Sequence, residues 1–273
     1  MPNHLSDREL LEALTFEIEL NLRRHIADAQ PWYPHEMVPW EQGRNFAFLD
    51  GEDWSPEQST ASDVDKLALT VGVLAADNLP SFHREIAKVL TVGAWWRWVN
   101  RWTAEEDRHS TLIRNFLMTT RAVDPVELER IRMKAMTDGY SAPSMHLIEL
   151  LANCAFEEAA AALRHRNTAA QTGDAMVAAI CNRIAADDEH QLLFYSNMVA
   201  AALDRVPDQA VAAIADRVAN FRVPVVDLPD NRDSTAELAA AGIYDPAREH
   251  ELVIAPLLDT WKVTDRVGAA STS

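Results

Sequence analysis

Trp102-Thr-Ala-Glu-Glu-Asp-Arg-His109 lies inside a segment, Ala94 to Asp124, that contains neither glycine nor proline. Its apolar residues recur with helical periodicity, which predicts one long helix. Glu106 and His109 are three residues apart, so a helix places both on one face, where they can bind one metal ion together. The carboxylate is then free to reach a second ion. The same spacing occurs by chance on many solvated helices, so the pair alone does not distinguish a metal site from an exposed helix face.

The composition indicates a helical protein with one large core. The chain has 273 residues, 48% of them hydrophobic, which is enough apolar surface for a sizeable core. Only eight residues are glycine, and runs of β-branched residues are scarce. Such a composition favours an all-α fold. We predict a single domain over residues 1–273, with a core at about 6–205 and C-terminal helices and a tail at 206–273.

Charge and hydropathy exclude several classes of partner. The net charge of −17 disfavours nucleic acid and anionic membranes, because both bind basic surfaces. No apolar run approaches the roughly 20 residues that a membrane span needs, and no basic-then-apolar leader precedes the first helix. These features predict a soluble, cytoplasmic protein without a membrane span. Cys154 and Cys181 lie inside predicted helices and are expected to be reduced thiols.

Capping residues and prolines divide the chain into helices. Ser6 and Glu9 form a capping box, Ser62 precedes the second helix, and Pro80 should interrupt that helix. The predicted helices are 6–27, 62 to the kink at 80, 94–124, 125–137, 143–170, the turn at 172–174 to about 204, 208–221 and 246–258. Residues 31–54 form an aromatic-rich connection, 224–233 a connector, and 268–273 a disordered end. Long helices joined by short turns predict an antiparallel bundle.

Two further helices offer carboxylates on otherwise apolar faces. Glu158 shares its face with Cys154 and small alanines, and Asp188 shares its face with Ile184 and Tyr195. A buried carboxylate needs a metal ion, an arginine or a proton. For either residue alone, a helix edge that reaches water is the better explanation. Three helices that each offer an inward carboxylate favour one shared site.

The motifs together resemble a known family, the soluble acyl-acyl-carrier-protein desaturases, and especially its mycobacterial members. The resemblance covers about residues 10–220. It is carried by Pro31-Trp-Tyr-Pro-His-Glu-Met-Val-Pro39, Asn78-Leu-Pro80, Trp102 to His109, Phe156-Glu-Glu158, Asn167-Thr-Ala169 and Ile184-Ala-Ala-Asp-Asp188. It implies a ferritin-like antiparallel helical bundle with additional shorter helices. It also implies two iron ions that activate O₂, an acyl chain on its acyl carrier protein as substrate, a ferredoxin-type electron donor and a homodimer.

The resemblance assigns roles residue by residue. Glu106 and His109 match the first ligand pair, Glu158 matches the lone glutamate of a later helix, and Asp188 matches the second bridging glutamate with one methylene fewer. Gln191 stands where the family has its second histidine. The remaining matches are Trp32 near the iron on an electron path, Asp187 beside the second ligand pair, and Trp102 at the opening of the first pair motif.

Two ligand positions depart from the family pattern. The second-helix glutamate aligns on Ala76, and the second histidine aligns on Gln191. A rival frame, Asp187 with His190, keeps the i, i+3 spacing but turns apolar residues away from the centre, so we prefer Asp188 with Gln191 facing inward. An amide oxygen binds first-row metals less well than imidazole, and a missing carboxylate leaves metal charge uncompensated. One iron, or none, is therefore the alternative to two.

The sequence predicts an acyl-acyl-carrier-protein desaturase-like oxidoreductase that uses iron and O₂ to dehydrogenate a carrier-bound acyl chain. The competing hypothesis is a non-catalytic or single-metal homologue that binds an acyl group or a partner without desaturase activity. Arg130, Arg132 and Lys134 are the candidate patch for docking an acidic carrier protein, although a solvated helix face has the same pattern.

Overall fold

Every regular element is helical in the computed structural model, which describes residues 4–141, 143–223, 228 and 233–265. The helices are α1 (Asp7–Ala13), α2 (Thr15–Asp28), α3 (Asp63–Asp77), α4 (Leu79–Ala87), α5 (Gly93–Thr119), α6 (Pro125–Asp138), α7 (Leu147–Gln171), α8 (Ala175–Arg205), α9 (Pro207–Asn220), α10 (Ser234–Ala240) and α11 (Ala255–Thr260). Shorter helical turns are η1 (Pro34–Glu36), η2 (Trp40–Gln42), η3 (Ala47–Leu49), η4 (Pro56–Gln58), η6 (Pro246–Arg248) and η7 (His250–Ile254). The predicted all-α fold class is confirmed.

The helix starts follow the capping residues of the sequence. The Ser6 side chain accepts the Glu9 backbone N–H, and the Glu9 carboxylate accepts the Ser6 backbone N–H. Ser62 caps α3 in the same position, and Asp124 caps α6 directly before Pro125. Each cap satisfies backbone donors that the first helical turn leaves unpaired.

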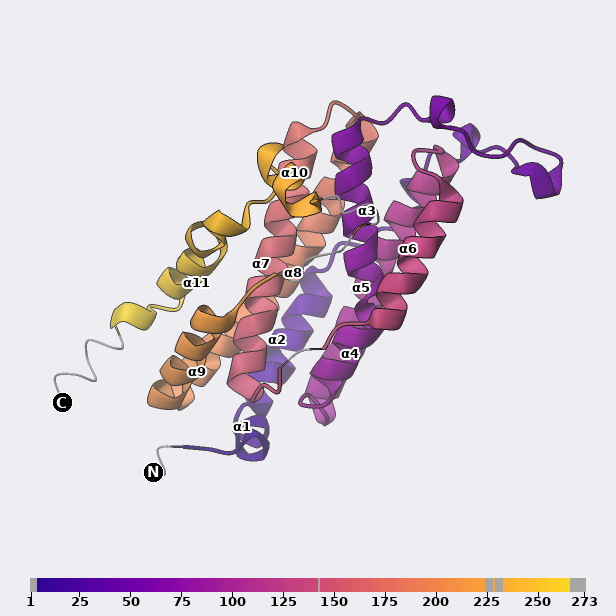
Figure 1. The fold of residues 1–273 in the computed structure, drawn as a ribbon. Coiled ribbons are helices and arrows are strands. Elements are labelled where there is room, and N and C mark those ends of the chain that lie inside the picture. Colours follow the sequence, from indigo (N-terminus) through magenta and orange to yellow (C-terminus); the bar gives the residue numbers. More distant parts are fainter. Residues whose placement is uncertain (1–3, 142, 224–227, 229–232, 266–273) are drawn as a thin grey trace.

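Long helices packed side by side form the bundle (Figure 1). The antiparallel helices α7 and α8 contact each other along most of their length, α2 packs on α8 and α5, and α3 packs on α5. One large apolar cluster is built mainly from α1, α2, the first half of α5, α7 and the second half of α8. A second cluster joins α3, the end of α5, α6 and the start of α8. Within the described ranges, every helix is too short or too polar to span a lipid bilayer.

Several helix boundaries differ from the sequence prediction. The first predicted helix breaks at Leu14, next to Thr15, whose hydroxyl donates to the Leu11 carbonyl and competes with the backbone ladder. The predicted helix 246–258 is instead η6, the π-helical turn η7 and α11, with Pro256 at the junction. Helix α10 was not predicted. The end at 268–273 and most of the connector 224–233 lie outside the described residues.

The segment between α2 and α3 forms an ordered arm, residues 34–58, that projects from one end of the bundle (Figure 1). Arg121 holds it in place: this buried residue has φ 53°, and its guanidinium donates to the carbonyls of Asn45 (2.7 Å) and Glu52 (3.0 Å). The same guanidinium lies 4.1 Å above the centre of the Phe46 ring. The long connection is therefore ordered by hydrogen bonds to one arginine at the end of α5.

Candidate metal centre

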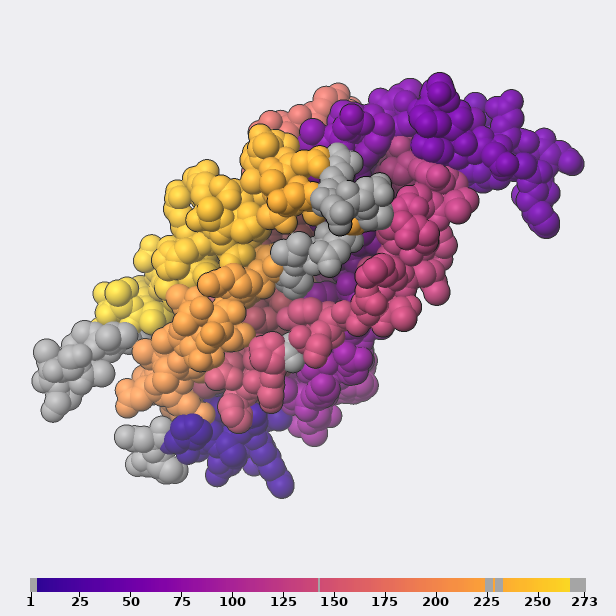
Figure 2. Space-filling view, viewed as in Figure 1, coloured from indigo at the N-terminus to yellow at the C-terminus, as the bar shows by residue number. Residues whose placement is uncertain are grey.

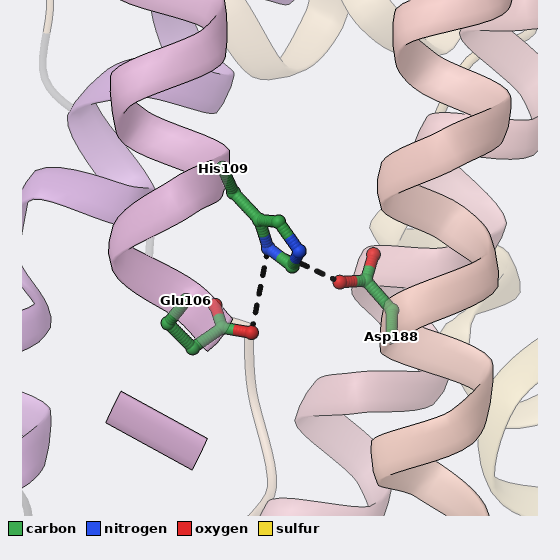
Figure 3. Close-up of side chains that lie close together, drawn as sticks. All are labelled: Glu106, His109 and Asp188. Atoms are coloured by element: carbon green, nitrogen blue, oxygen red, sulfur yellow. Dashed lines mark ion pairs between the residues drawn. The ribbon is translucent and has the colours of Figure 1, made fainter. Parts of the chain in front are cut away.

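Glu106 and His109 of α5 face Asp188 of α8 across the bundle interior (Figure 3). His109 Nδ1 lies 3.4 Å from Glu106 Oε1 and 3.7 Å from Asp188 Oδ1. One ligand atom from each residue lies within 4.8 Å of the others, and His109 and Asp188 are each only 2% exposed. Among the described residues, Glu106 Oε1 is buried without a hydrogen-bond donor. Two carboxylates, one of them with this unsatisfied oxygen, and an imidazole suit one divalent first-row metal ion.

Asp187 connects this group to Trp32, which lies two residues before the arm. Trp32 Nε1 donates to Asp187 Oδ2 at 2.7 Å, and His109 Nε2 lies 3.4 Å from the same oxygen. Arg183 binds the other carboxylate oxygen at 2.5 Å. Burial raises the pKa of Asp187, but His109, Trp32 and Arg183 outweigh burial, and the pKa is lowered. Asp187 is therefore a carboxylate that orients the His109 ring, as carboxylates behind metal-binding histidines commonly do.

The charge around His109 is strongly negative. Burial lowers the pKa of His109, but the nearby Glu106, Asp187 and Asp188 carboxylates raise it well above its usual range. The carboxylates therefore favour a proton on the ring, and a divalent ion that binds there competes with that proton.

Glu158 of α7 lies near the same acidic pair but is turned toward a tryptophan. It is 7% exposed, and its Oε1 accepts a hydrogen bond from Trp102 Nε1 at 2.8 Å. Burial and the charges of Glu106 and Asp188 raise the pKa of Glu158 well above its usual range, although the Trp102 donor lowers it. Glu158 is thus electrostatically coupled to the pair without belonging to the compact group of three.

His165 is a residue of the centre that sequence reasoning missed. It lies on α7, seven residues after Glu158, and its Nδ1 is 2.8 Å from Asp188 Oδ2. The side chain is buried, and Nε2 has no hydrogen-bond partner within the described part of the chain. The i, i+7 spacing places His165 on the Glu158 face of the helix. A lone histidine without a second motif residue carries no metal-site signal by itself, so the sequence did not assign it to the site.

The two departures from the family pattern leave the second ion without a compact donor set. Ala76 carries no ligand, and Asp77 turns toward Ser110 and Arg132. Gln191 is fully buried, but neither its amide oxygen nor its amide nitrogen has a hydrogen-bond partner among the residues that the structure describes. Among the described residues, Glu106, His109 and Asp188 form the only compact group of three or more metal-binding side chains. The residues fit one ion, and they do not fit two as the family arrangement would.

The rival frame for the second pair does not place a histidine at the centre. His190 stacks on His25, with ring centroids 4.0 Å apart, and His25 in turn contacts Glu105. Asp188 and Gln191 are 2% and 0% exposed, so these two residues face the interior.

A cavity of about 420 Å³ runs beside the centre and reaches α6. Glu106, His109, Glu158 and Asp188 line it together with small and apolar residues, among them Ala76 and Phe82. The exposed Arg130 and Lys134 line it at α6. Arg132 does not belong to this basic patch, contrary to the sequence prediction, because it is 7% exposed and pairs with Asp77.

Residues 6–273 match the sequence profile of the fatty acid desaturase family. The chain belongs to that family. It is 38% identical to DesA1 of Mycobacterium tuberculosis, which is named as an acyl-[acyl-carrier-protein] desaturase, over 97% of this chain and 81% of DesA1. It is 37% identical to DesA2 of the same organism, over 91% of this chain and 92% of DesA2, which carries the same activity in its name.

The fold of a family member has been solved by crystallography. The X-ray structure of DesA2 from Mycobacterium tuberculosis H37Rv superposes with a TM-score of 0.78 at 34% identity, covering 93% of this chain and 95% of that one. The resemblance read from the tryptophan and carboxylate motifs is confirmed, and the helical bundle is that of the desaturases.

Proposed function

We propose that the protein is an acyl-acyl-carrier-protein desaturase-like oxidoreductase of fatty acid metabolism, which uses iron and O₂ to remove two hydrogens from a carrier-bound acyl chain. One observation carries this proposal. The buried group Glu106, His109 and Asp188 lies on the wall of a largely apolar cavity of about 420 Å³, whose lining suits a hydrocarbon chain. Family membership supports the same activity.

The overall reaction defines the reactants that the centre must bring together. A saturated –CH₂–CH₂– unit, O₂, two electrons and two protons give –CH=CH– and two molecules of water. Iron, when bound, supplies the O₂ activation that side chains alone do not provide. The family implies two ions, whereas the residues of this chain provide a compact set of ligands for one, Glu106, His109 and Asp188. Removal of an unactivated hydrogen also requires that water is kept away from the chain, which the apolar wall of the cavity does.

The remaining site residues orient this group. Asp187 holds His109 Nε2 and accepts the Trp32 N–H, so it fixes the ring that would bind the metal ion. Trp32 also stacks near His109, with ring centroids 6.4 Å apart, and we assign it to the path by which electrons enter. Trp102 holds Glu158 at the edge of the centre. Gln191 is kept as a weak ligand or as a donor to a bound ligand.

The partners follow from the same proposal. The substrate carrier would dock where Arg130 and Lys134 line the cavity, since acyl carrier proteins are acidic. Each cation also contacts an acidic neighbour, Glu127 and Asp138 respectively, so docking would exchange one carboxylate partner for another. A ferredoxin-type donor, a homodimer of single ferritin-like domains and a cytoplasmic location complete the proposal by analogy with the family.

Product analysis tests this function. The iron-loaded protein is incubated aerobically with acyl carrier protein charged with chains of several lengths, a ferredoxin and its reductase, and the released fatty acids are separated by mass. A product two mass units lighter than its substrate is expected from the wild type and is lost in Glu106→Ala. Asp107→Ala removes the exposed carboxylate next in sequence and should retain activity. The proposal is wrong if no chain yields this product.

A further inference from the structure

Arg164 is a cation beside the candidate metal centre, and within the described residues it has no ion-pair partner. It lies on α7 next to His165 and lines the cavity. Its guanidinium forms no hydrogen bond or ion pair with any residue in the described part of the chain, and its Nε is buried without a partner. Burial lowers the pKa of Arg164, and the charges of Asp188 and Glu106 act in the opposite direction. The side chain is half-buried, and a guanidinium in such a place without a paired carboxylate is costly unless its charge serves its surroundings.

The charge of the centre can be counted from the side chains. Glu106, Glu158 and Asp188 together carry at most three negative charges. Asp187 does not add to this count, because Arg183 contacts it at 2.5 Å and Arg108 at 3.5 Å. One divalent ion and the Arg164 guanidinium supply three positive charges, which balances the three carboxylates. A second divalent ion would leave an excess of two positive charges over these carboxylates in a buried site.

The donor atoms lead to the same count. The compact group supplies ligands for one ion, and Ala76 offers none for another. The second oxygen of Asp188 is 2.8 Å from His165 Nδ1, and an oxygen of Glu158 is 2.8 Å from Trp102 Nε1. These two oxygens, one of Asp188 and one of Glu158, are therefore engaged by side chains and are less available to a second ion.

We propose that the centre binds one divalent metal ion, through Glu106, His109 and Asp188, and that the Arg164 guanidinium takes the electrostatic place of a second ion. The inference rests on the proposed function in that it concerns the same centre, and it deepens that function by stating the number of ions. Three protein ligands on one ion leave coordination positions open for other ligands.

Metal binding by the protein alone tests the number of ions. The metal-free protein is titrated with Mn²⁺ and followed by calorimetry, by elemental analysis after desalting and by electron paramagnetic resonance. One equivalent with the six-line signal of an isolated Mn²⁺ is expected. Glu106→Ala should lose this binding and Asp107→Ala should keep it. Two bound equivalents, or the signal of a spin-coupled pair, would overturn the proposal.

A charge-matched pair of variants tests the role of Arg164. Arg164→Met removes the positive charge beside the centre and should tighten Mn²⁺ binding at least tenfold, since the carboxylates then exceed the charge of the bound ion. Arg166→Met makes the same change of net charge two residues away, where Arg166 pairs with Glu189 on the surface, and should leave the affinity nearly unchanged. Unchanged or weaker binding in Arg164→Met would overturn the assignment.

Rebuilding the family ligands provides a second, independent test. Ala76→Glu with Gln191→His restores the two missing donors, and adding Arg164→Met should strengthen binding of a second Mn²⁺ at least tenfold over the double variant. Equal affinity for the second Mn²⁺ in the double and triple variants would show that Arg164 does not oppose binding of a second ion. These measurements need no acyl substrate, so a failure of metal counting and a failure of product formation are observed separately.

Discussion

At the scale of single residues, hydrogen bonds hold the carboxylates of the centre in place. Trp32 donates to Asp187, Trp102 donates to Glu158, and His165 contacts Asp188, all between 2.7 and 2.8 Å. Each partner limits the rotamers of its carboxylate, so the protein has already met part of the entropy cost of arranging ligands. The same contacts reduce the number of free carboxylate oxygens, which restricts what the centre can bind.

Glu157 gives the cavity wall a pH-dependent stability. Burial raises its pKa to about 7, although Asn153 and Arg217 act in the opposite direction. The folded state therefore holds a proton that the unfolded chain releases near pH 4.5, and the free energy of unfolding falls as pH rises from about 4.5 to 7. Between pH 5 and pH 8, we expect the free energy of unfolding to fall by about 2 kcal/mol less in Glu157→Gln than in the wild type.

Urea unfolding of the metal-free protein at both pH values measures this difference. The control variant is Glu41→Gln, which changes an exposed carboxylate of the arm and should follow the wild type. If Glu157→Gln also follows the wild type, Glu157 is ionised in the folded protein and burial does not raise its pKa.

Helical periodicity predicted the inward residues but not their partners. Spacing alone placed Glu158, Asp188 and Gln191 on buried faces, because neighbouring apolar residues fix which side of a helix meets the core. It did not reveal that His165 contacts Asp188 or that Arg164 lines the cavity, because those contacts depend on how α7 and α8 are rotated about their axes. The prediction that Arg132 belongs to the basic patch on α6 was wrong for the same reason, because the Arg132 side chain faces α3.

At the scale of elements, a buried ion pair joins α6 to α3 beside the cavity. Arg132 of α6 contacts Asp77 of α3, and Ser110 of α5 donates to the same carboxylate. Asp77 and Arg132 are 8% and 7% exposed. Helix α6 forms the cavity wall that contains Ile131 and Ala135, so this pair fixes one side of the cavity.

Breaking the pair on one side should be more costly than removing both partners. Asp77→Asn or Arg132→Met alone leaves a buried charge and is expected to lower the free energy of unfolding by about 3 kcal/mol. The double variant should lose clearly less than the sum of the two. Urea unfolding of the four proteins gives the coupling energy. Lys134→Met, which breaks the exposed pair with Asp138, should change stability by less than about 1 kcal/mol. Additive losses in the double variant would show that the pair does not couple α6 to α3.

At the scale of the whole molecule, the bundle was predictable and the arm was not. Helix caps and prolines are local signals, so α3, α6, α7 and α8 could be located from sequence to within a few residues. The arm depends on Arg121, which binds carbonyls about 70 residues earlier in the chain, and no local pattern reports such a contact. The aromatic residues of that segment indicated order, but they did not show that its tip would project from the bundle.

The tip of the arm exposes apolar side chains that a monomer does not need. Phe48 is 96% exposed and Leu49 is 60% exposed, and both belong to η3 of the arm. The arm projects from the bundle at the upper right of Figure 2. Rigid and exposed apolar groups of this kind commonly mark protein interfaces. In the homodimer that we propose by analogy with the family, a second copy of the chain would cover this surface.

Light scattering on a size-exclusion column tests this arrangement. The wild type is expected at about twice the chain mass of 30.5 kDa, and Phe48→Ser with Leu49→Ser should shift it toward the monomer. Because these side chains contribute little buried surface within one chain, the helical content should not change. Val126→Ser alters an apolar residue that is 76% exposed on α6, away from the arm, and should leave the dimer intact. A wild type that elutes as a monomer at micromolar concentration would show that the arm serves a different partner.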